Sequence, residues 1–293
     1  MTETEDRIRA LPLWKGPIEI VPLTGGLSNE SYIVTEPGGR HVVRVGRDFP
    51  FHHVYRDREA MVSLAAHQAG FGPEVRYVEP GLMVTEYLSA RTCTPEDIRA
   101  NAPRIARLLS RFHQEMASRV TGAGFLFWVF HVIRDYAGTL KANGSRWADQ
   151  LPRLVQISTE LEAAQTLLPI VFGHNDLLPA NFLDDGERLW LIDFEYAGFN
   201  TAMFDLAGVA SNAGMDSEQS RAFVEIYLGR GASPEIIRAL SAMQAASLLR
   251  EALWGMVSEL YLNAPGVDYV AYARENLEKF EAALSRYKSA YPA

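Results

Sequence analysis

The sequence contains one cysteine, Cys93, among 293 residues, and it lacks an apolar run as long as a membrane span. One cysteine cannot close an intramolecular disulfide, which favours a reducing compartment. A helix that spans a bilayer needs about 20 apolar residues. The first six residues are acidic and lack the basic and apolar regions of a secretory signal. We therefore expect a soluble, cytoplasmic protein without a membrane span.

Basic residues are also scarce, because 28 Lys and Arg face 36 Asp and Glu and give a net charge of −8. This balance argues against nucleic acid as a partner, since neutralising phosphates requires a basic face. Low-complexity tracts are absent, and a hydrophobic content of 48% with 11% aromatic residues predicts well-formed cores. The chain exceeds the usual size of a single core, so we expect two lobes.

The most informative pattern runs from His174 to Asn181 and resumes at Asp193: H-x-D-x-x-x-x-N, then D-F. It has the spacing of a kinase catalytic loop and the metal-binding strand after it. Phosphoryl transfer needs a carboxylate that orients the acceptor hydroxyl and takes its proton, a role that suits Asp176. It also needs oxygen ligands for Mg²⁺, a role that suits Asn181 and Asp193. Each residue alone would more often be an ordinary turn residue, but together they favour a phosphoryl-transfer site.

Residues before position 89 differ in pattern from those after it. The predicted strands are 18–23, 31–35, 41–45 and 82–85, and the predicted helix among them is 55–69. The later sequence is α-rich apart from a hairpin at the catalytic loop, with predicted helices at 103–119 and 235–262. The order predicts an α+β, two-lobed, protein-kinase-like fold. We place the nucleotide-binding lobe at 1–88 and the catalytic and substrate-binding lobe at 89–293.

The small lobe offers candidate contacts for a nucleotide. The loop 25–29, Gly-Gly-Leu-Ser-Asn, lies between two predicted strands and suits phosphate binding by backbone N–H groups, although such a turn alone is more often a simple hairpin. Arg44 lies on the strand where kinases carry a phosphate-contacting lysine, and Glu59 in the following helix is placed to pair with it. Without that context the pair would be a surface ion pair of little value. Residues 86–88 are positioned as the connection between lobes, whose backbone would meet adenine.

Three runs, at 173–182, 191–198 and 204–207, resemble the choline/ethanolamine kinases, which belong with aminoglycoside phosphotransferases in the protein-kinase-like superfamily. The loop 25–29 is similar to the phosphate-binding loop of that family. Trp254-Gly255 and the run 269–273 resemble its C-terminal substrate region. The resemblance thus extends over nearly the whole chain.

The resemblance implies ATP and Mg²⁺ as cofactors and a role for each matching residue. Asp176 would be the catalytic base, and Asn181 and Asp193 the Mg²⁺ ligands. Asp205 would brace the catalytic loop through His174 or the nearby backbone. The nucleotide contacts would be Ser28, Asn29, Arg44, Glu59, Glu86 and Leu88.

Aromatic residues bear on the acceptor. A quaternary ammonium has no N–H to donate, so aromatic faces and a carboxylate hold it. The positions that match the substrate region of the family are Tyr196, Trp254, Tyr269 and Tyr272. Taken alone, Trp254 on so apolar a helix would more often be core. The eukaryotic enzymes carry a second tryptophan three residues later, where this chain has Val257, and the difference leaves room for ethanolamine or another amino alcohol.

The sequence therefore predicts transfer of the γ-phosphoryl group of MgATP to a small amino alcohol, choline first, with a homodimer as the candidate assembly. Two alternatives stay open: a kinase of an aminoglycoside, thiamine or a sugar, and a non-catalytic nucleotide-binding regulatory protein on the same fold. We expect a mainly aromatic pocket with scattered acids such as Glu251 and Glu259. The histidines His52, His53 and His67 lack metal-ligand spacing and are expected at the surface.

Overall fold

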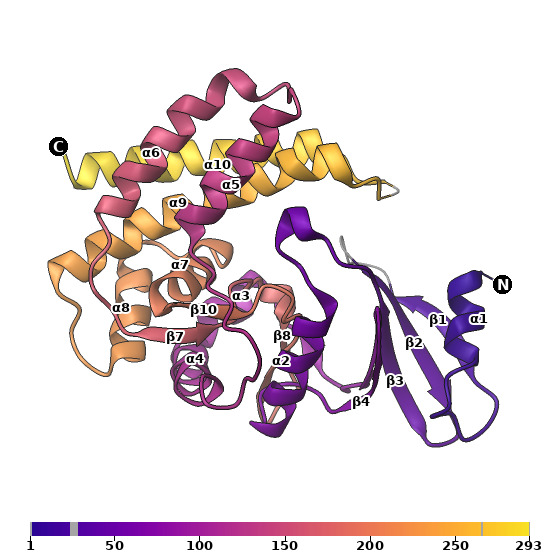
Figure 1. Ribbon diagram of the computed structural model, residues 1–293. Coiled ribbons are helices and arrows are strands. Elements are labelled where there is room, and N and C mark those ends of the chain that lie inside the picture. The colour runs from indigo at the N-terminus through magenta and orange to yellow at the C-terminus, as the bar shows by residue number, and fades with distance from the viewer. Residues whose placement is uncertain (1, 24–28, 265, 293) are drawn as a thin grey trace.

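The computed structural model describes residues 2–23, 29–264 and 266–292, and in Figure 1 a sheet-containing N-terminal part lies beside a larger helical part. The strands are β1 Glu19–Leu23, β2 Glu30–Glu36, β3 Gly39–Val45, β4 Val75–Glu79, β5 Leu82–Glu86, β6 Arg91–Thr92, β7 Ile170–Gly173, β8 Phe182–Asp184, β9 Leu189–Leu191 and β10 Gly198–Thr201. The helices are α1 Glu3–Arg9, α2 Arg56–Gln68, α3 Pro95–Ala100, α4 Ala102–Met116, α5 Val129–Ala142, α6 Leu151–Ala163, α7 Ala202–Asn212, α8 Ser217–Leu228, α9 Pro234–Tyr261 and α10 Tyr269–Ala290. Single 3₁₀ turns are η1 Pro50–His52, η2 Ala148–Gln150 and η3 Pro179–Asn181.

The N-terminal sheet is antiparallel and, within the described residues, has five strands in the order β1-β2-β3-β5-β4. A tight turn joins β2 to β3, and Gly39 at its end has a φ of 142°, a conformation that favours glycine. Alternating apolar residues turn one face of the sheet toward α1. The buried cluster between them consists of Ile8, Leu11, Tyr32, Val34, Val43, Leu82 and Val84. The four predicted strands agree with β1, β2, β3 and β5.

The helical part is organised around α9, which packs against α5, α6, α7 and α10. Its bounds agree with the predicted helix 235–262 to within one residue. The helix is apolar on nearly all sides, as expected of one buried in a core, yet it carries the buried polar residues Arg250 and Ser258. Across the described ranges, no helix combines the length and the apolar character that crossing a bilayer would require.

Helix α2 contacts β4 of the sheet and also contributes to the hydrophobic core of the helical part. Its residues Val62, Ala65 and Ala66, with Phe71 after it, belong to the large hydrophobic cluster of the helical part. The sheet has the smaller cluster of its own. Hydrophobic packing therefore does not divide the chain at residue 88, and the division into 1–88 and 89–293 stays a prediction.

Two small sheets in the helical part hold the segment 174–181. Strand β7 pairs antiparallel with β10 and ends at Gly173. Strand β8 begins at Phe182 and pairs antiparallel with β9, with Phe182 opposite Leu191. The loop 174–181 is thus fixed at both ends by strands, and Asp193 follows the end of β9 on the same side of the hairpin as Asn181.

Candidate active site

Two residues of the candidate site, one in the loop 174–181 and one after β9, have backbone conformations that ordinary turn residues seldom adopt. Asn175 has a φ of 63° and Asp193 a φ of 68°, values that residues other than glycine seldom adopt. Such strained positions gather at functional sites, because the surrounding structure has to stabilise them. Here the side-chain amide of Asn175 donates to the carbonyl oxygens of Tyr196 (3.1 Å) and Gly198 (3.2 Å).

Asp205 on α7 holds the same loop from the other side. Its two carboxylate oxygens accept hydrogen bonds from the backbone N–H groups of His174 (2.8 Å) and Asn175 (2.7 Å). His113 on α4 also lies 2.8 Å from it through Nε2. Burial works to raise the pKa of Asp205, but the hydrogen bond and charge of His113 outweigh it, so the pKa is lowered. Asp205 is thereby kept ionised against the loop, and His113 is a supporting residue that the sequence did not indicate.

His174 links the loop to the strand that precedes Asp193. The side chain is fully buried, and its Nε2 lies 2.9 Å from the carbonyl oxygen of Ile192. Burial lowers the pKa of His174, so the ring is neutral, and a carbonyl partner requires the proton on Nε2. A neutral histidine that donates to this strand positions the loop and does not supply a proton to the chemistry.

Asp176 and Asn181 contact each other within the loop. The amide nitrogen of Asn181 donates to the carbonyl oxygen of Asp176 at 2.7 Å and lies 3.3 Å from its carboxylate Oδ2. The backbone N–H of Ile192 donates to the carbonyl oxygen of Asn181 at 3.1 Å, which brings Asn181 beside Asp193. Burial raises the pKa of Asp176 well above its ordinary value, and nearby carboxylates, Asp193 first, add to this while Arg250 opposes it. A carboxylate of raised basicity is suited to accept a hydroxyl proton.

Asn181 and Asp193 offer oxygen donors that suit Mg²⁺. The amide nitrogen of Asn181 is turned toward Asp176, so its oxygen is presented on the other side of the group. Mg²⁺ is commonly bound by one or two protein oxygens and completes its shell with phosphate oxygens and water. No group of three or more His, Cys, Asp or Glu side chains able to hold a metal occurs in the part of the chain that the structure describes. The oxygen donors of Asn181 and Asp193 have the chemistry that suits Mg²⁺ bound together with a nucleotide.

An ion pair joins the N-terminal sheet to this site. Arg44 on β3 lies 2.8 Å from the Oδ1 atom of Asp193 through Nη2 and 3.0 Å from Glu59 on α2 through Nη1. The expected pairing of Arg44 with Glu59 is thus present. Burial works to raise the pKa of Asp193, but the charge and hydrogen bond of Arg44 outweigh it and keep the pKa low.

The charged cluster extends to residues that the sequence did not indicate. Arg56 on α2 pairs with Glu195 at 3.0 Å and also with Glu59. Burial, followed by the charge of Asp193, raises the pKa of Glu195 to about 7. The side-chain amide of Asn29 donates to Glu195 at 3.4 Å, while Ser28 lies outside the described residues. The signal for Glu195 was its place two residues after Asp193 in the D-F-E run.

The segment 86–88 begins at Glu86, the last residue of β5. The side chain of Glu86 accepts a hydrogen bond from the backbone of Glu74 at 2.9 Å. Tyr87 donates through its backbone to the carbonyl oxygen of Arg40 at 3.1 Å, and Leu88 is half-buried. The Glu86 carboxylate is therefore engaged by the backbone of the residue before β4.

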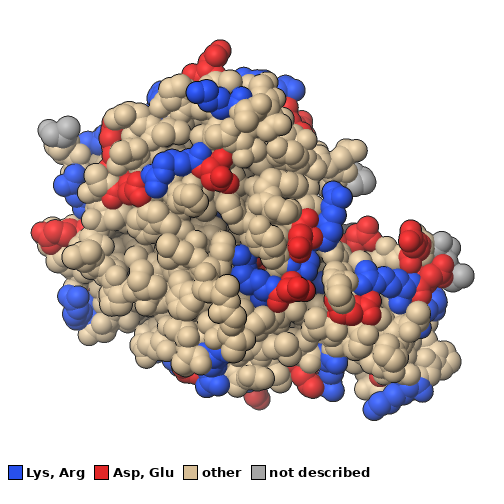
Figure 2. Space-filling model, in the orientation of Figure 1, with Lys and Arg blue, Asp and Glu red and all other residues tan. Residues whose placement is uncertain are grey.

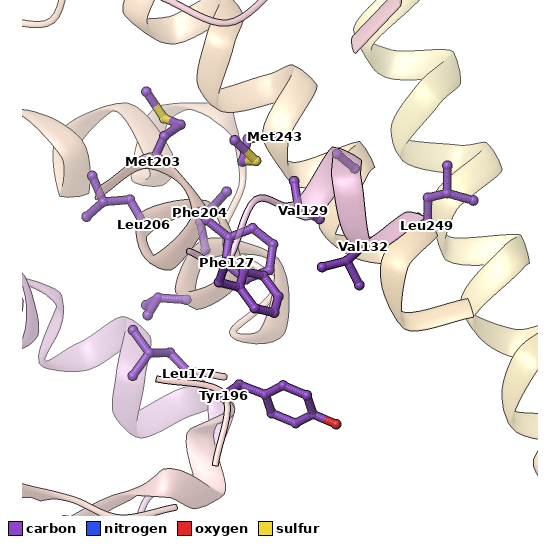
Figure 3. Packing of buried hydrophobic residues seen from close by; sticks show 14 of the residues in the cluster. Phe127, Val129, Val132, Leu177, Tyr196, Met203, Phe204, Leu206, Met243 and Leu249 are labelled. Carbon is purple, nitrogen blue, oxygen red and sulfur yellow. The ribbon is translucent and has the colours of Figure 1, made fainter. Parts of the chain in front are cut away.

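The aromatic residues named above lie together. Trp254 donates through Nε1 to the hydroxyl of Tyr196 at 2.9 Å, and its ring centroid lies 5.6 Å from that of Tyr272 and 6.2 Å from that of Tyr269. A fifth ring, His52, stacks on Trp254 at 5.0 Å. Tyr196 packs edge-on to Phe127, which in turn contacts Phe204 (Figure 3).

The expectation of a surface position is wrong for His52. Its side chain is 2% exposed, and its two ring nitrogens lie 3.1 Å from the hydroxyl of Tyr136 and 2.9 Å from that of Ser258. The turn η1 inserts this residue between α5 and α9, a tertiary placement that local sequence cannot reveal. Burial lowers its pKa well below the ordinary value, so the ring is neutral.

A cavity of about 330 Å³ opens beside Asp176 and is bordered by α3, α7, α9 and α10. Arg250 and Glu251 of α9 line it together with Asp176. Of the described residues in its wall, only Phe204 is aromatic. The cavity therefore differs from the mainly aromatic pocket expected from the sequence, and Glu259 is engaged elsewhere, with Trp147 and Arg146.

The distribution of charge on the surface is relevant to nucleic acid as a partner. On the face shown in Figure 2, acidic and basic residues are interspersed and form no continuous basic area. Phosphate backbones require such an area.

The fold and the site together define a kinase-like phosphotransferase. A protein-family model described as choline/ethanolamine kinase matches residues 20–281. The chain belongs to the choline/ethanolamine kinase family. The predicted family and fold class are confirmed.

Individual relatives agree with this assignment. Protein LicA of Haemophilus influenzae is 27% identical over 69% of this chain, and a probable ethanolamine kinase of Arabidopsis thaliana is 30% identical over 70% of it. The matches cover 61% and 62% of those two proteins, so the chain spans about three fifths of their length. The crystal structure of a choline/ethanolamine kinase family protein from Mesorhizobium loti superposes with a TM-score of 0.76, at 28% identity and over 98% of this chain and 97% of that one.

Proposed function

We propose that the protein transfers the γ-phosphoryl group of ATP to the hydroxyl of a small amino alcohol in the cytoplasm. Choline and ethanolamine are the first candidates, because relatives carry those names. The observation that carries the proposal is the contact of Asn181 with Asp176, next to Asp193. A proton acceptor and two magnesium-type oxygen ligands at one loop are what phosphoryl transfer from a nucleotide requires.

Asp176 acts on the acceptor. Its carboxylate orients the hydroxyl and takes the proton as the oxygen attacks the γ-phosphorus, while the bond from that phosphorus to the β–γ bridging oxygen breaks and ADP leaves. The raised pKa of Asp176 makes it a stronger base than an exposed aspartate. Asn181 fixes the rotamer of Asp176 through its amide nitrogen.

Residues 1–88 form the nucleotide lobe in this proposal. Arg44 holds phosphate oxygens with its planar guanidinium, and Glu59 fixes the orientation of Arg44. Ser28 and Asn29 cover the phosphates, and the backbone of 86–88 meets adenine. Bound Mg²⁺, held by Asn181 and Asp193, would neutralise charge on the phosphates.

The acceptor side of the site lies in residues 89–293. Tyr196 and Trp254 are joined by a hydrogen bond, and Tyr269 and Tyr272 pack around Trp254. We assign this group to the shaping of the acceptor pocket. The cavity beside Asp176 supports the assignment, because Glu251 in its wall accepts a hydrogen bond from the hydroxyl of Tyr272.

The test is ATP consumption with choline, ethanolamine, thiamine, an aminoglycoside and simple sugars, each against a reaction without acceptor. We expect acceptor-dependent ADP release with an amino alcohol and a new phosphomonoester signal in ³¹P NMR. Turnover of only the aminoglycoside, thiamine or a sugar would contradict an amino alcohol as the acceptor and would support a kinase of that other compound. Binding of ATP without turnover of any acceptor would point to a regulatory protein.

A further inference from the structure

A short loop lies between β3 and α2 in the sequence but packs on the helical part. Its ends, Phe49 and Val54, exchange two backbone hydrogen bonds of 2.9 and 3.1 Å. At its tip, Phe51 stacks on Tyr261 of α9, with the ring centroids 4.5 Å apart. The loop is thus closed at its base and docked at its tip, and it carries the next residue, His52, in between α5 and α9.

The ring of His52 is held at both nitrogens and on one face. Nδ1 lies 3.1 Å from the hydroxyl of Tyr136 on α5, and Nε2 lies 2.9 Å from that of Ser258 on α9. Because a hydroxyl can donate or accept, both ring nitrogens are satisfied in either tautomer. The ring stacks on Trp254, with centroids 5.0 Å and planes 22° apart. With both nitrogens engaged and 2% of the residue exposed, the ring serves to hold the indole and not to transfer a proton.

Two tyrosines connect Trp254 to the wall of the cavity of about 330 Å³. The ring centroid of Trp254 lies 5.6 Å from that of Tyr272, whose hydroxyl donates to Glu251 in the wall. The Nε1 atom of Trp254 donates to the hydroxyl of Tyr196 at 2.9 Å. The carbonyl oxygen of Tyr196 in turn accepts a hydrogen bond from the amide of Asn175, which also lines the cavity. The position of the indole therefore bears on two wall residues from different parts of the fold.

We propose that His52 is a positioning residue for the acceptor, because it fixes the plane of Trp254 and, through Trp254, the wall of the acceptor cavity. Loss of the imidazole would leave a gap against one face of the indole, and side chains beside a gap lose contacts and repack. A small misplacement near reacting groups is enough to lower the rate. The inference rests on the proposed function, and it adds to the acceptor side a residue that precedes α2.

The first measurement follows the indole directly and does not depend on turnover. Labelling with 5-fluorotryptophan gives a ¹⁹F resonance for each of the five tryptophans, and Trp254→Leu identifies the resonance of Trp254. His52→Ala should shift or broaden this resonance and leave the others in place. His67→Ala, near the end of α2, is the matched control and should leave it unchanged. An unchanged Trp254 resonance in His52→Ala would overturn the proposal.

A second variant covers the case in which His52→Ala does not fold, which collapse of all the resonances into one narrow band would report. Ser258→Ala removes one hydroxyl partner of His52 and leaves the imidazole in place. It should shift the same Trp254 resonance by a smaller amount. No shift in this variant would also count against the proposal.

Michaelis constants distinguish positioning of the acceptor from a general loss of stability. His52→Ala should raise the KM of choline or ethanolamine by about 3- to 10-fold, the contribution of one aromatic pair, while the KM of ATP changes by less than about twofold. His52→Gln keeps a planar polar group that can bond a hydroxyl and should recover part of the loss. Equal changes in the two Michaelis constants would overturn the proposal.

A double-mutant cycle tests whether His52 acts through Trp254. In the Trp254→Leu background, His52→Ala should raise the KM of the acceptor no further, because the contact that His52 supports is already gone. Additive effects of the two changes would overturn the proposal.

The two kinds of measurement separate this inference from the proposed function. A Trp254 resonance that responds to His52→Ala, in a protein that turns over no acceptor, would support the hold of His52 on Trp254 and contradict the kinase proposal. Normal turnover of choline or ethanolamine by His52→Ala, with an unchanged Trp254 resonance, would support the kinase proposal and overturn the inference.

Discussion

Arg44 and Asp193, 149 residues apart in the chain, form an ion pair in which Nη2 lies 2.8 Å from Oδ1. The pair joins the N-terminal sheet to the catalytic hairpin. Both side chains are assigned to MgATP, Arg44 to phosphate and Asp193 to the metal, and here each neutralises the other. The site thus keeps two opposite charges partly buried without the cost of leaving either one unpaired.

Asp193→Ala should remove turnover and spare the fold. The side chain of Asp193 is 30% exposed and pairs with Arg44 instead of packing in the hydrophobic core. Its loss should therefore remove the proposed metal ligand and disturb little of the packing. We expect turnover at ordinary Mg²⁺ to fall by about 10²-fold or more, with an unchanged circular dichroism spectrum. Asp185→Ala, in the exposed turn between β8 and β9, is the control and should keep activity. Global unfolding of the Asp193 variant would make this residue structural.

Asp176→Asn should lower turnover by about 10²-fold or more while ATP still binds, as for loss of a positioned base. The same change should raise stability. Burial raises the pKa of Asp176, so the folded protein binds its proton more tightly than the unfolded chain, and this residue stabilises less as pH rises toward neutrality. An amide has no such charge, and each kcal/mol gained raises the melting temperature by about 2–4 °C.

Melting curves and single-turnover rates at pH 7 test both effects of Asp176→Asn. Asp149→Asn, an exposed carboxylate in η2, is the matched control and should change neither quantity. Near-normal turnover of the Asp176 variant with its best acceptor would remove Asp176 from the role of base.

Glu195 should give the stability a pH dependence near neutrality. Burial and then Asp193 raise its pKa to about 7, from an ordinary value of 4.5. Between pH 4.5 and pH 7 the folded protein therefore binds more protons at Glu195 than the unfolded chain does. The stabilisation by protonated Glu195 is complete below pH 4.5 and is lost as the pH rises to about 7. Glu195→Gln cannot ionise. The melting temperature of Glu195→Gln minus that of the wild type, measured in the same buffers, should rise between pH 5 and pH 8. A difference that stays constant would contradict the raised pKa of Glu195.

How much was predictable from sequence differs between local and tertiary features. The catalytic loop, Arg44 with Glu59, and helix α9 carry local patterns of spacing or periodicity, and the structure agrees with them. Strand β4 has no counterpart among the predicted strands, although Val75–Glu79 alternates apolar and polar residues for part of its length. Its short alternation was too weak a signal.

The other residues that the sequence did not place correctly are ones whose surroundings depend on the tertiary structure. The sequence around His52 gave no sign of burial for this histidine, and the packing of η1 against α9 buries it. Arg250 did leave a signal, since a charged residue in so apolar a helix has to find a partner or a cavity. Which of the two it finds depends on the fold of α3, α7 and α10 around it.

Trp254→Leu should affect both stability and the acceptor. The ring is 6% exposed, stacks on His52 and donates to Tyr196, so its loss should cost on the order of 2 kcal/mol of stability and lower the melting temperature. Because Tyr196 in turn lies against Arg250, the KM of the acceptor should rise about threefold or more, while the KM of ATP stays nearly constant. Trp190→Leu, at the partly exposed middle position of β9, is the control and should leave both Michaelis constants unchanged. Equal changes in the two constants for the Trp254 variant would mean that this tryptophan serves the core alone.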